Sequence, residues 1–160
     1  MTERELITRV SVCQFSELSI GYQNLINEAK KQTSFSYAPY STFNVGAAVL
    51  LENGEIVAAN NQENSAYPSG LCAERIAMFY ANAHFPSVAP KAIAIAAYTK
   101  GSFLVQTIAP CGACRQVLLE SETRYQKDIE VLLYGESEIL VIKNSKNLLP
   151  LSFTKESLGK

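Results

Sequence analysis

The chain has 160 residues, of which 48% are hydrophobic and 18% charged, and its formal net charge is −1. This length suits one globular domain with a sizeable core, and the composition is ordinary for such a protein. The chain lacks a long basic run, which argues against a nucleic-acid partner because phosphate backbones are usually met by clustered Lys and Arg. It also lacks an apolar stretch that could span a bilayer and an apolar signal-peptide core near its start, so we expect a cytoplasmic protein without a membrane partner.

The first part of the chain is expected to form an arm and a helix. Residues 5–15 follow no clean hydrophobic period, and we interpret them as a short extended arm. Cys13 lies in this arm without a nearby Cys or His, so we expect a part-buried thiol. Apolar residues then recur at helical spacing over 19–32, and two lysines occupy the last turn, which predicts a helix. Pro39 breaks this helical pattern.

A hairpin and a polar loop are expected next. The apolar runs 43–51 and 56–59 are joined by a turn containing Asn53-Gly54, a strong signal for a hairpin. Phe43 opens the first of these strands. The segment 60–70 that follows is polar and rich in turn formers, and it lies between a strand and a helix, where loops often carry binding groups.

The second half of the chain alternates helices and strands. We expect helices over 72–83 and 112–123, a central strand covered on both faces over 91–98, and two more strands over 129–134 and 139–142. His84, the only histidine, lies near a helix end without other ligand types at a useful spacing, and we expect it to be structural or solvated. This order predicts one mixed sheet with helices packed on its faces.

Three of the four cysteines lie in two short segments, Cys72-Ala73-Glu74-Arg75 and Pro110-Cys111-Gly112-Ala113-Cys114-Arg115-Gln116. A Cys-x-x-Cys turn in a cytoplasmic protein indicates metal or redox chemistry rather than a disulfide framework. Together with Cys72 it would give a zinc ion three ligands and leave one position open for water, which is the arrangement of catalytic zinc sites. Both segments lie at predicted helix starts, where the partial positive charge favours thiolates.

The two residues after Cys72-Ala73 suit a hydrolytic zinc centre. Glu74 comes two residues after Cys72, and its carboxylate is free to exchange protons with water at the metal. Arg75 could offset the charge of the three thiolates if its guanidinium reaches a ligand sulfur. Cys-x-Glu at one helix start and Pro-Cys-x-x-Cys at another form the combination of the zinc nucleobase deaminases.

From about residue 19 to 153 the chain closely resembles the small homotetrameric zinc cytidine deaminases of nucleoside salvage. The resemblance rests on the order and spacing of six motifs: Tyr-Ala-Pro-Tyr-Ser, Phe-Asn-Val-Gly-Ala-Ala, Asn-Gln-Glu-Asn-Ser-Ala-Tyr, Cys-Ala-Glu-Arg, Pro-Cys-Gly-Ala-Cys-Arg-Gln and Leu-Leu-Pro-Leu-Ser-Phe. It implies a three-layer α/β/α fold with a mixed five-stranded sheet and helices on both faces. It also implies a single domain over 1–160, with 1–18 as an arm of unassigned role.

The resemblance further implies hydrolytic deamination of cytidine and 2′-deoxycytidine by a homotetramer with shared active sites and one zinc per chain. The family pattern assigns a role to ten positions: Cys72, Cys111 and Cys114 as zinc ligands, Glu74 as the proton shuttle, Arg75 as charge compensation, Asn61 and Glu63 on the ribose hydroxyls, Phe43 against the pyrimidine, and Tyr67 and Phe153 in a neighbouring subunit's site.

Three alternatives stay open at this point. The protein could deaminate another cytosine-bearing compound, such as a nucleoside antibiotic. It could be a non-enzymatic protein with a structural zinc or a redox Cys-x-x-Cys. It could also edit polynucleotides, although the acidic balance of the chain disfavours that.

Overall fold

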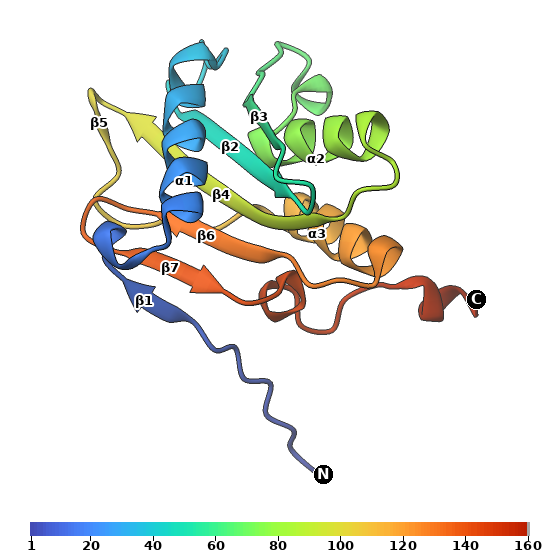
Figure 1. Ribbon diagram of the computed structural model, residues 1–160. Coiled ribbons are helices and arrows are strands. Elements are labelled where there is room, and N and C mark those ends of the chain that lie inside the picture. The colour runs from blue at the N-terminus through green and yellow to red at the C-terminus, as the bar shows by residue number, and fades with distance from the viewer. Residues whose placement is uncertain (160) are drawn as a thin grey trace.

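The computed structural model describes residues 1–159 and places them in three layers, with a mixed sheet between helices on both of its faces (Figure 1). Within these residues the α-helices are α1 (Ile20–Gln32), α2 (Ala73–His84) and α3 (Gly112–Tyr125). The strands are β1 (Ser11–Cys13), β2 (Asn44–Leu51), β3 (Ile56–Asn60), β4 (Pro90–Thr99), β5 (Ser102–Phe103), β6 (Glu130–Tyr134) and β7 (Ile139–Ile142). None of the helices in this range is long and apolar enough to cross a membrane.

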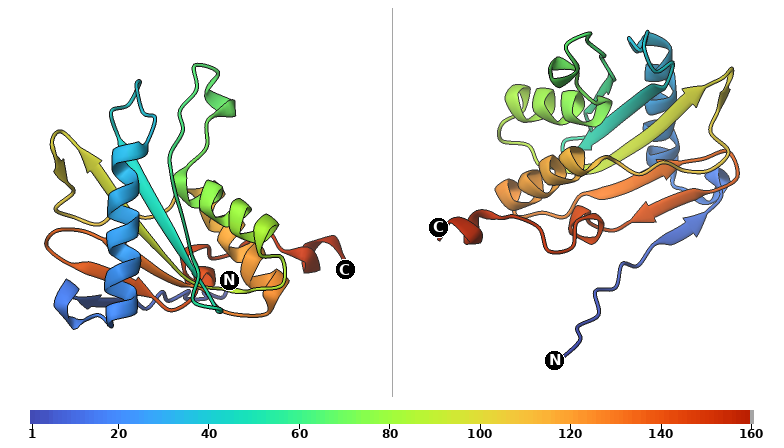
Figure 2. Two further views of the ribbon diagram at one scale, coloured as in Figure 1. Left: turned by 45° about the horizontal axis from the view of Figure 1, so that its top comes forward. Right: turned by 180° about the vertical axis from the view of Figure 1, so that it is seen from behind.

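The sheet has the strand order β1-β7-β6-β4-β2-β3, and β5 pairs with β4. Strands β4 and β6 run parallel, whereas β2 pairs antiparallel with both β3 and β4. A parallel pair needs a crossover, and α3 supplies the helix of this one. The views in Figure 2 show α1 alone on one face of the sheet and α2 beside α3 on the other.

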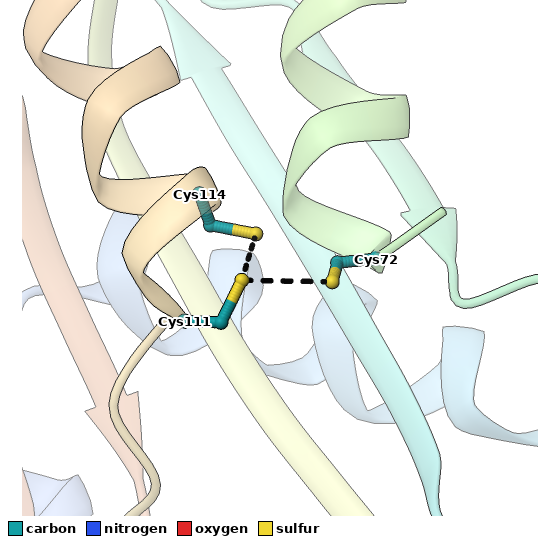
Figure 3. A group of neighbouring side chains, drawn as sticks. All are labelled: Cys72, Cys111 and Cys114. Atoms are coloured by element: carbon teal, nitrogen blue, oxygen red, sulfur yellow. Dashed lines mark hydrogen bonds between the residues drawn. The ribbon is translucent and has the colours of Figure 1, made fainter. Parts of the chain in front are cut away.

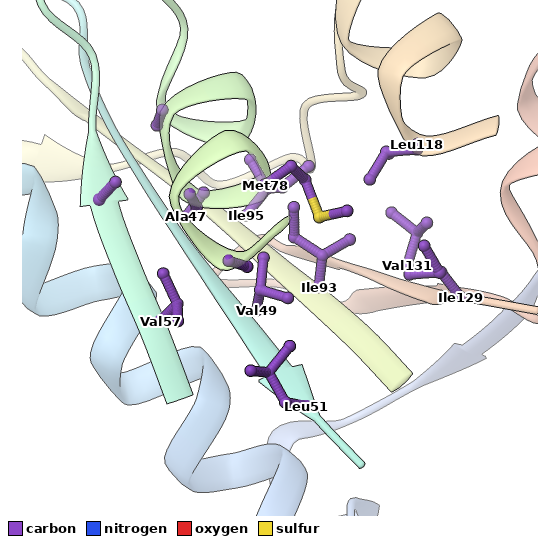
Figure 4. Packing of buried hydrophobic residues seen from close by; sticks show 14 of the residues in the cluster. Ala47, Val49, Leu51, Val57, Met78, Ile93, Ile95, Leu118, Ile129 and Val131 are labelled. Carbon is purple, nitrogen blue, oxygen red and sulfur yellow. The ribbon is translucent and has the colours of Figure 1, made fainter. Parts of the chain in front are cut away.

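Successive side chains of the central strands point to opposite faces of the sheet, and so the core has two parts, one on each face. In β4, Ile93 and Ile95 point into the cluster that contains Met78 of α2 and Leu118 of α3 (Figure 4). The intervening alanines of β4 face α1, as does Ala48 of β2. Branched side chains fill the space beneath α2 and α3, and small side chains let α1 approach the sheet closely.

The predicted elements are confirmed with small shifts at their ends, but the predicted strand number is wrong. The sheet has seven strands among the described residues, not five, because β1 and β5 were not expected as strands. They contain three and two residues, too few to show a period of two. Their pairing depends on the free edge of β7 and on a tight turn after β4.

The two ends of the chain lie away from the main core. β1 is part of the predicted extended arm, residues 5–15, and earlier in the same arm Thr8 Oγ1 donates to the carbonyl of Asn147 at 2.7 Å. The residues 148–153 are apolar but interrupted by Pro150, so the sequence predicts that they pack against another surface rather than continue the sheet. Leu148 does contact the core, but Leu151 is 92% exposed and Phe153 59% exposed, so this expectation is only partly met within one chain.

Two residues outside the proposed site behave as expected from the sequence. Cys13 is a half-buried thiol whose Sγ lies 3.9 Å from the carbonyl oxygen of Ile139. The ring of His84 stacks on Tyr80, with 5.1 Å between ring centroids, and meets the edge of Phe85. Both are therefore explained by packing.

Gly46 in β2 is the point of closest approach between the sheet and α1. A Cβ built on Gly46 would collide with the carbonyl oxygen of Ala29 and would lie 2.9 Å from Cβ of Gln32. Because both neighbours belong to the helix and its last turn, neither can move without displacing α1. Gly21, on the exposed side of α1, has open space around it.

We therefore expect Gly46→Ala to lower the free energy of unfolding by about 1–3 kcal/mol, the usual cost of overpacking. Gly21→Ala is the matched control and should be neutral or raise that free energy by up to about 1 kcal/mol, because alanine favours helix. Urea unfolding followed by circular dichroism measures both. An unfolding midpoint of Gly46→Ala equal to that of the wild type would contradict this account of the α1 contact.

Candidate active site

Three cysteine side chains from two helix starts meet on one side of the sheet. Cys72 is the N-cap of α2, Cys111 is the N-cap of α3, and Cys114 follows in the first turn of α3. Figure 3 shows the three thiols pointing toward one another across the gap between the helices. The Sγ atoms of Cys72 and Cys111 lie 3.8 Å apart, those of Cys111 and Cys114 lie 3.4 Å apart, and all three lie within 4.8 Å of one another.

These separations match what a zinc ion requires. Zn–S bonds of about 2.3 Å in tetrahedral geometry place neighbouring sulfurs about 3.8 Å apart. The cysteine cluster therefore fits a zinc ion with three sulfur ligands. Among the described residues, Cys72, Cys111 and Cys114 form a group of potential ligand side chains that are close enough to bind one ion together.

The ionisation of the three thiols also favours the binding of a cation. The thiol of Cys114 and the guanidinium of Arg75 lower the pKa of Cys72 to about 5. The same interaction with Cys72, together with burial, raises the pKa of Cys114. One thiolate thus opposes ionisation of its neighbour, and a cation is needed to hold three thiolates together.

Glu74 and Arg75 flank the cluster from the first turn of α2. Glu74 is only 6% exposed, and burial raises the pKa of its carboxyl group. Nη2 of Arg75 lies 4.0 Å from Sγ of Cys72, so the guanidinium does reach a cluster sulfur. The arrangement places a buried carboxyl group and a positive charge beside the three sulfurs.

A cleft of about 820 Å³ opens over this cluster. Its floor includes Cys72, Cys111 and Glu74, and Ile108 lines it from the loop before α3. Its other walls come from residues 40–45, which are the end of the loop before β2 and the start of that strand, and from residues 61–71, the loop that follows β3. Cys114 is buried behind the floor, with 1% of its surface exposed. The volume is within the range of small-ligand sites.

Asn61 and Glu63, the two residues that the family pattern assigns to the ribose hydroxyls, line the cleft, and both are held by the backbone of β2 or of the loop before it. Asn61 Oδ1 accepts from the N–H of Val45 at 2.8 Å, and Asn61 Nδ2 donates to the carbonyl of Phe43 at 2.9 Å. Each amide atom keeps one unused bonding position. Glu63 accepts from the N–H groups of Tyr40 and Ser41, at 2.9 and 3.3 Å, and from the Ser41 hydroxyl.

The aromatic residues assigned to the site fall into two groups. Phe43 and Tyr67 line the cleft, and Tyr67 stands at its rim, 78% exposed and edge-on to Tyr40 at 6.3 Å between centroids. Phe153 does not line the cleft of its own chain. Its carbonyl oxygen instead accepts from Nε2 of Gln116 on α3 at 2.9 Å, with the ring left exposed.

Sequence reasoning missed the residues that hold these parts in place. Tyr40 and Ser41 act on Glu63 partly through backbone N–H groups, which leave no residue-type signal. Arg115 is visible in the Pro-Cys-x-x-Cys-Arg-Gln motif, but its partners are distant. Its guanidinium donates to the carbonyls of Pro110 at 2.8 Å and Leu148 at 2.7 Å, and so ties the cysteine turn to the C-terminal segment.

Comparison with known proteins agrees with this geometry. Residues 20–127 match the model of the cytidine and deoxycytidylate deaminase zinc-binding region. The chain is 41% identical to cytidine deaminase of Sporosarcina psychrophila, over 86% of this chain and 94% of that protein. It is 38% identical to cytidine deaminase of Halalkalibacterium halodurans, over 86% of this chain and 97% of that protein.

A solved structure shows the same fold. The crystal structure of cytidine deaminase from Burkholderia pseudomallei superposes with a TM-score of 0.69 at 38% sequence identity, covering 82% of this chain and 98% of that chain. The matched family region is zinc-binding, and the cysteine cluster fits one zinc ion per chain. The chain therefore belongs to the family of zinc-dependent cytidine and deoxycytidylate deaminases.

Proposed function

We propose that this protein deaminates free cytidine and 2′-deoxycytidine to the corresponding uridines, with release of ammonia, as a step of pyrimidine salvage. The observation that carries the proposal is the buried Glu74 carboxyl group beside three converging cysteine sulfurs at the floor of a nucleoside-sized cleft. The curated relatives of similar length are named cytidine deaminases, which supports cytidine as the substrate.

In this proposal Cys72, Cys111 and Cys114 hold one zinc ion, and Arg75 compensates part of their negative charge. The first-turn N–H groups of α2 and α3 add to that compensation, since neither helix has a side-chain hydrogen bond at its N-cap. Zinc, when bound, lowers the pKa of water and so supplies a nucleophile at neutral pH.

Glu74 carries the protons of the reaction. Its carboxylate accepts a proton from the attacking water and donates it to N3 of the pyrimidine, which makes C4 electrophilic. After addition at C4, Glu74 takes the remaining proton of the added hydroxyl and delivers it to the amino group, and the C4–N bond breaks to release ammonia. Burial suits this role because it stabilises the protonated carboxyl group between the two transfers.

The nucleoside would lie between the cluster and the two loops of the cleft. Phe43 is proposed to pack against the pyrimidine ring, and Asn61 and Glu63 to bind the ribose hydroxyls. An amide with a free donor and acceptor and a carboxylate with remaining acceptor capacity suit hydroxyl groups.

We further propose a homotetramer in which each active site takes residues from a neighbouring chain. Phe153 supports this proposal because its ring is exposed and outside the cleft of its own chain. Tyr67 stands at the cleft rim, where it could also meet a second chain.

We propose that residues 1–160 form one catalytic domain. We also propose that the enzyme is cytoplasmic, because thiol ligands stay reduced in that compartment.

The substrate assignment is tested by adding cytidine and 2′-deoxycytidine separately to the purified protein. Loss of the cytosine absorbance and release of ammonia are expected with both nucleosides. A cytosine-bearing oligonucleotide serves as the comparison and should be unchanged. Inertness toward both nucleosides would overturn the proposal.

Glu74→Gln should lower turnover of cytidine about a hundredfold or more, the usual effect of deleting a proton-transfer group. The amide has almost the same shape, so zinc content and thermal unfolding should stay as in the wild type. Glu120→Gln on the exposed side of α3 is the control and should keep full activity. Wild-type turnover by Glu74→Gln would remove this residue from the mechanism.

Shared sites are tested by mixing two variants of lowered activity. Phe153→Ala should lose roughly tenfold or more in kcat/KM, because it deletes an aromatic binding contact. When Phe153→Ala and Glu74→Gln chains are co-expressed in equal amounts, about a quarter of the sites would receive both native residues if these come from different chains. Recovery of activity is therefore expected. If Phe153 served the site of its own chain, the mixture would regain nothing.

A further inference from the structure

The loop that precedes β2 donates three hydrogen bonds to the side chain of Glu63. The backbone N–H groups of Tyr40 and Ser41 donate to Glu63 Oε2 at 2.9 and 3.3 Å. The Ser41 hydroxyl donates to the other carboxylate oxygen, Oε1. These donors lie 22 and 23 residues before Glu63 in the sequence, so the contact joins two separate walls of the cleft.

The direction of the Ser41 hydroxyl is fixed by a further partner. Oγ of Ser41 accepts from the N–H of Phe43 at 3.0 Å, so its own hydrogen is directed to Glu63. A single hydroxyl thereby connects the carboxylate proposed to face the sugar with the backbone of the residue proposed to face the base. The hydrogen bond from the Ser41 hydroxyl also lowers the pKa of the Glu63 carboxyl group, and the hydrogen bond from the Tyr40 N–H lowers it further. Both bonds favour the carboxylate, which accepts hydrogen bonds.

Backbone hydrogen bonds that do not involve the Ser41 side chain also hold the loop in position. The N–H of Tyr37 donates to the carbonyl of Asn61 at 3.0 Å, and the N–H of Glu63 donates to the carbonyl of Tyr37 at 2.8 Å. These backbone bonds hold the two loops together as a short parallel bridge between Tyr37 and Gln62. Removing the hydroxyl should therefore free Oε1 of Glu63 and loosen the carboxylate, while the N–H groups of Tyr40 and Ser41 still bind Oε2 and the bonds through Tyr37 keep the loop in place.

We propose that Ser41 is a positioning residue that sets the Glu63 carboxylate toward the sugar and leaves it room for a single sugar hydroxyl. This inference rests on the proposed assignment of Glu63 to the ribose. A carboxylate offers about four acceptor positions, and three are occupied by the loop. A carboxylate fixed in this way has already lost its rotamer freedom before the nucleoside binds, which favours affinity.

The inference predicts a substrate-dependent effect of Ser41→Ala. KM for cytidine should rise about tenfold, because Glu63 is no longer fully positioned before the nucleoside binds and its hydrogen bond to the sugar weakens, with a smaller change in kcat. With 2′,3′-dideoxycytidine, which offers Glu63 no secondary hydroxyl, Ser41→Ala and wild type should have equal kcat/KM. Ser65→Ala, on the loop of Glu63 but outside the cleft lining, is the matched control.

Glu63→Gln and the double variant complete the test. Glu63→Gln should raise KM for cytidine, and Ser41→Ala should add nothing further in the Glu63→Gln background, because Ser41 acts through Glu63. The penalty of Glu63→Gln should also disappear with only one of 2′-deoxycytidine and 3′-deoxycytidine.

The outcomes separate this inference from the function on which it rests. An unchanged KM in Glu63→Gln would overturn the ribose assignment itself. A raised KM in Glu63→Gln with an unchanged KM in Ser41→Ala would overturn only the positioning role. Equal losses on cytidine and dideoxycytidine, or additive losses in the double variant, would show that Ser41 supports the fold rather than Glu63. Equal partial loss of the Glu63→Gln penalty with both deoxynucleosides would contradict binding of a single hydroxyl.

Discussion

The side-by-side placement of two helix starts is the constraint on which the site depends. Strand β3 leads into α2 at Cys72, and α3, which crosses from β4 to β6, begins at Cys111, so the topology of the sheet brings the three sulfurs within 4.8 Å. Three thiolates so close together repel one another, and the helix ends and Arg75 offset only part of that charge. A bound cation therefore links the metal site to the stability of the α2–α3 layer.

The opposite wall of the cleft is organised by hydrogen bonds rather than by charge. The loops before and after the β2–β3 hairpin are joined through Tyr37 and Gln62, and Asn61 spans the backbone of Phe43 and Val45. These contacts stand on strands whose packing against α1 leaves no room for a side chain at Gly46. The cysteine cluster and this hydrogen-bonded wall thus line the same cleft, which suits the orientation of a small nucleoside.

Sequence reasoning recovered the parts of this architecture that leave a local pattern. Helical spacing, the Asn53-Gly54 turn and the continuous apolar run of β4 predict their elements within a few residues. The cysteine segments and Glu74 are visible because their chemistry needs particular residue types. The strands β1 and β5 are too short to show the two-residue hydrophobic period of a strand. The hydrogen bond from Tyr40 to Glu63 comes from a backbone N–H, which almost any residue could supply. The position of Phe153 depends on where the C-terminal segment packs, which no local pattern records.

The central claim is that Cys72, Cys111 and Cys114 together bind one zinc ion and leave it able to take a further ligand. Zinc K-edge X-ray absorption of the purified protein, with the metal content of the same sample, tests this most directly. The account predicts one zinc per chain with three sulfur neighbours at about 2.3 Å and at least one lighter neighbour. Four sulfur neighbours, or a protein that binds zinc without sulfur ligation, would contradict it.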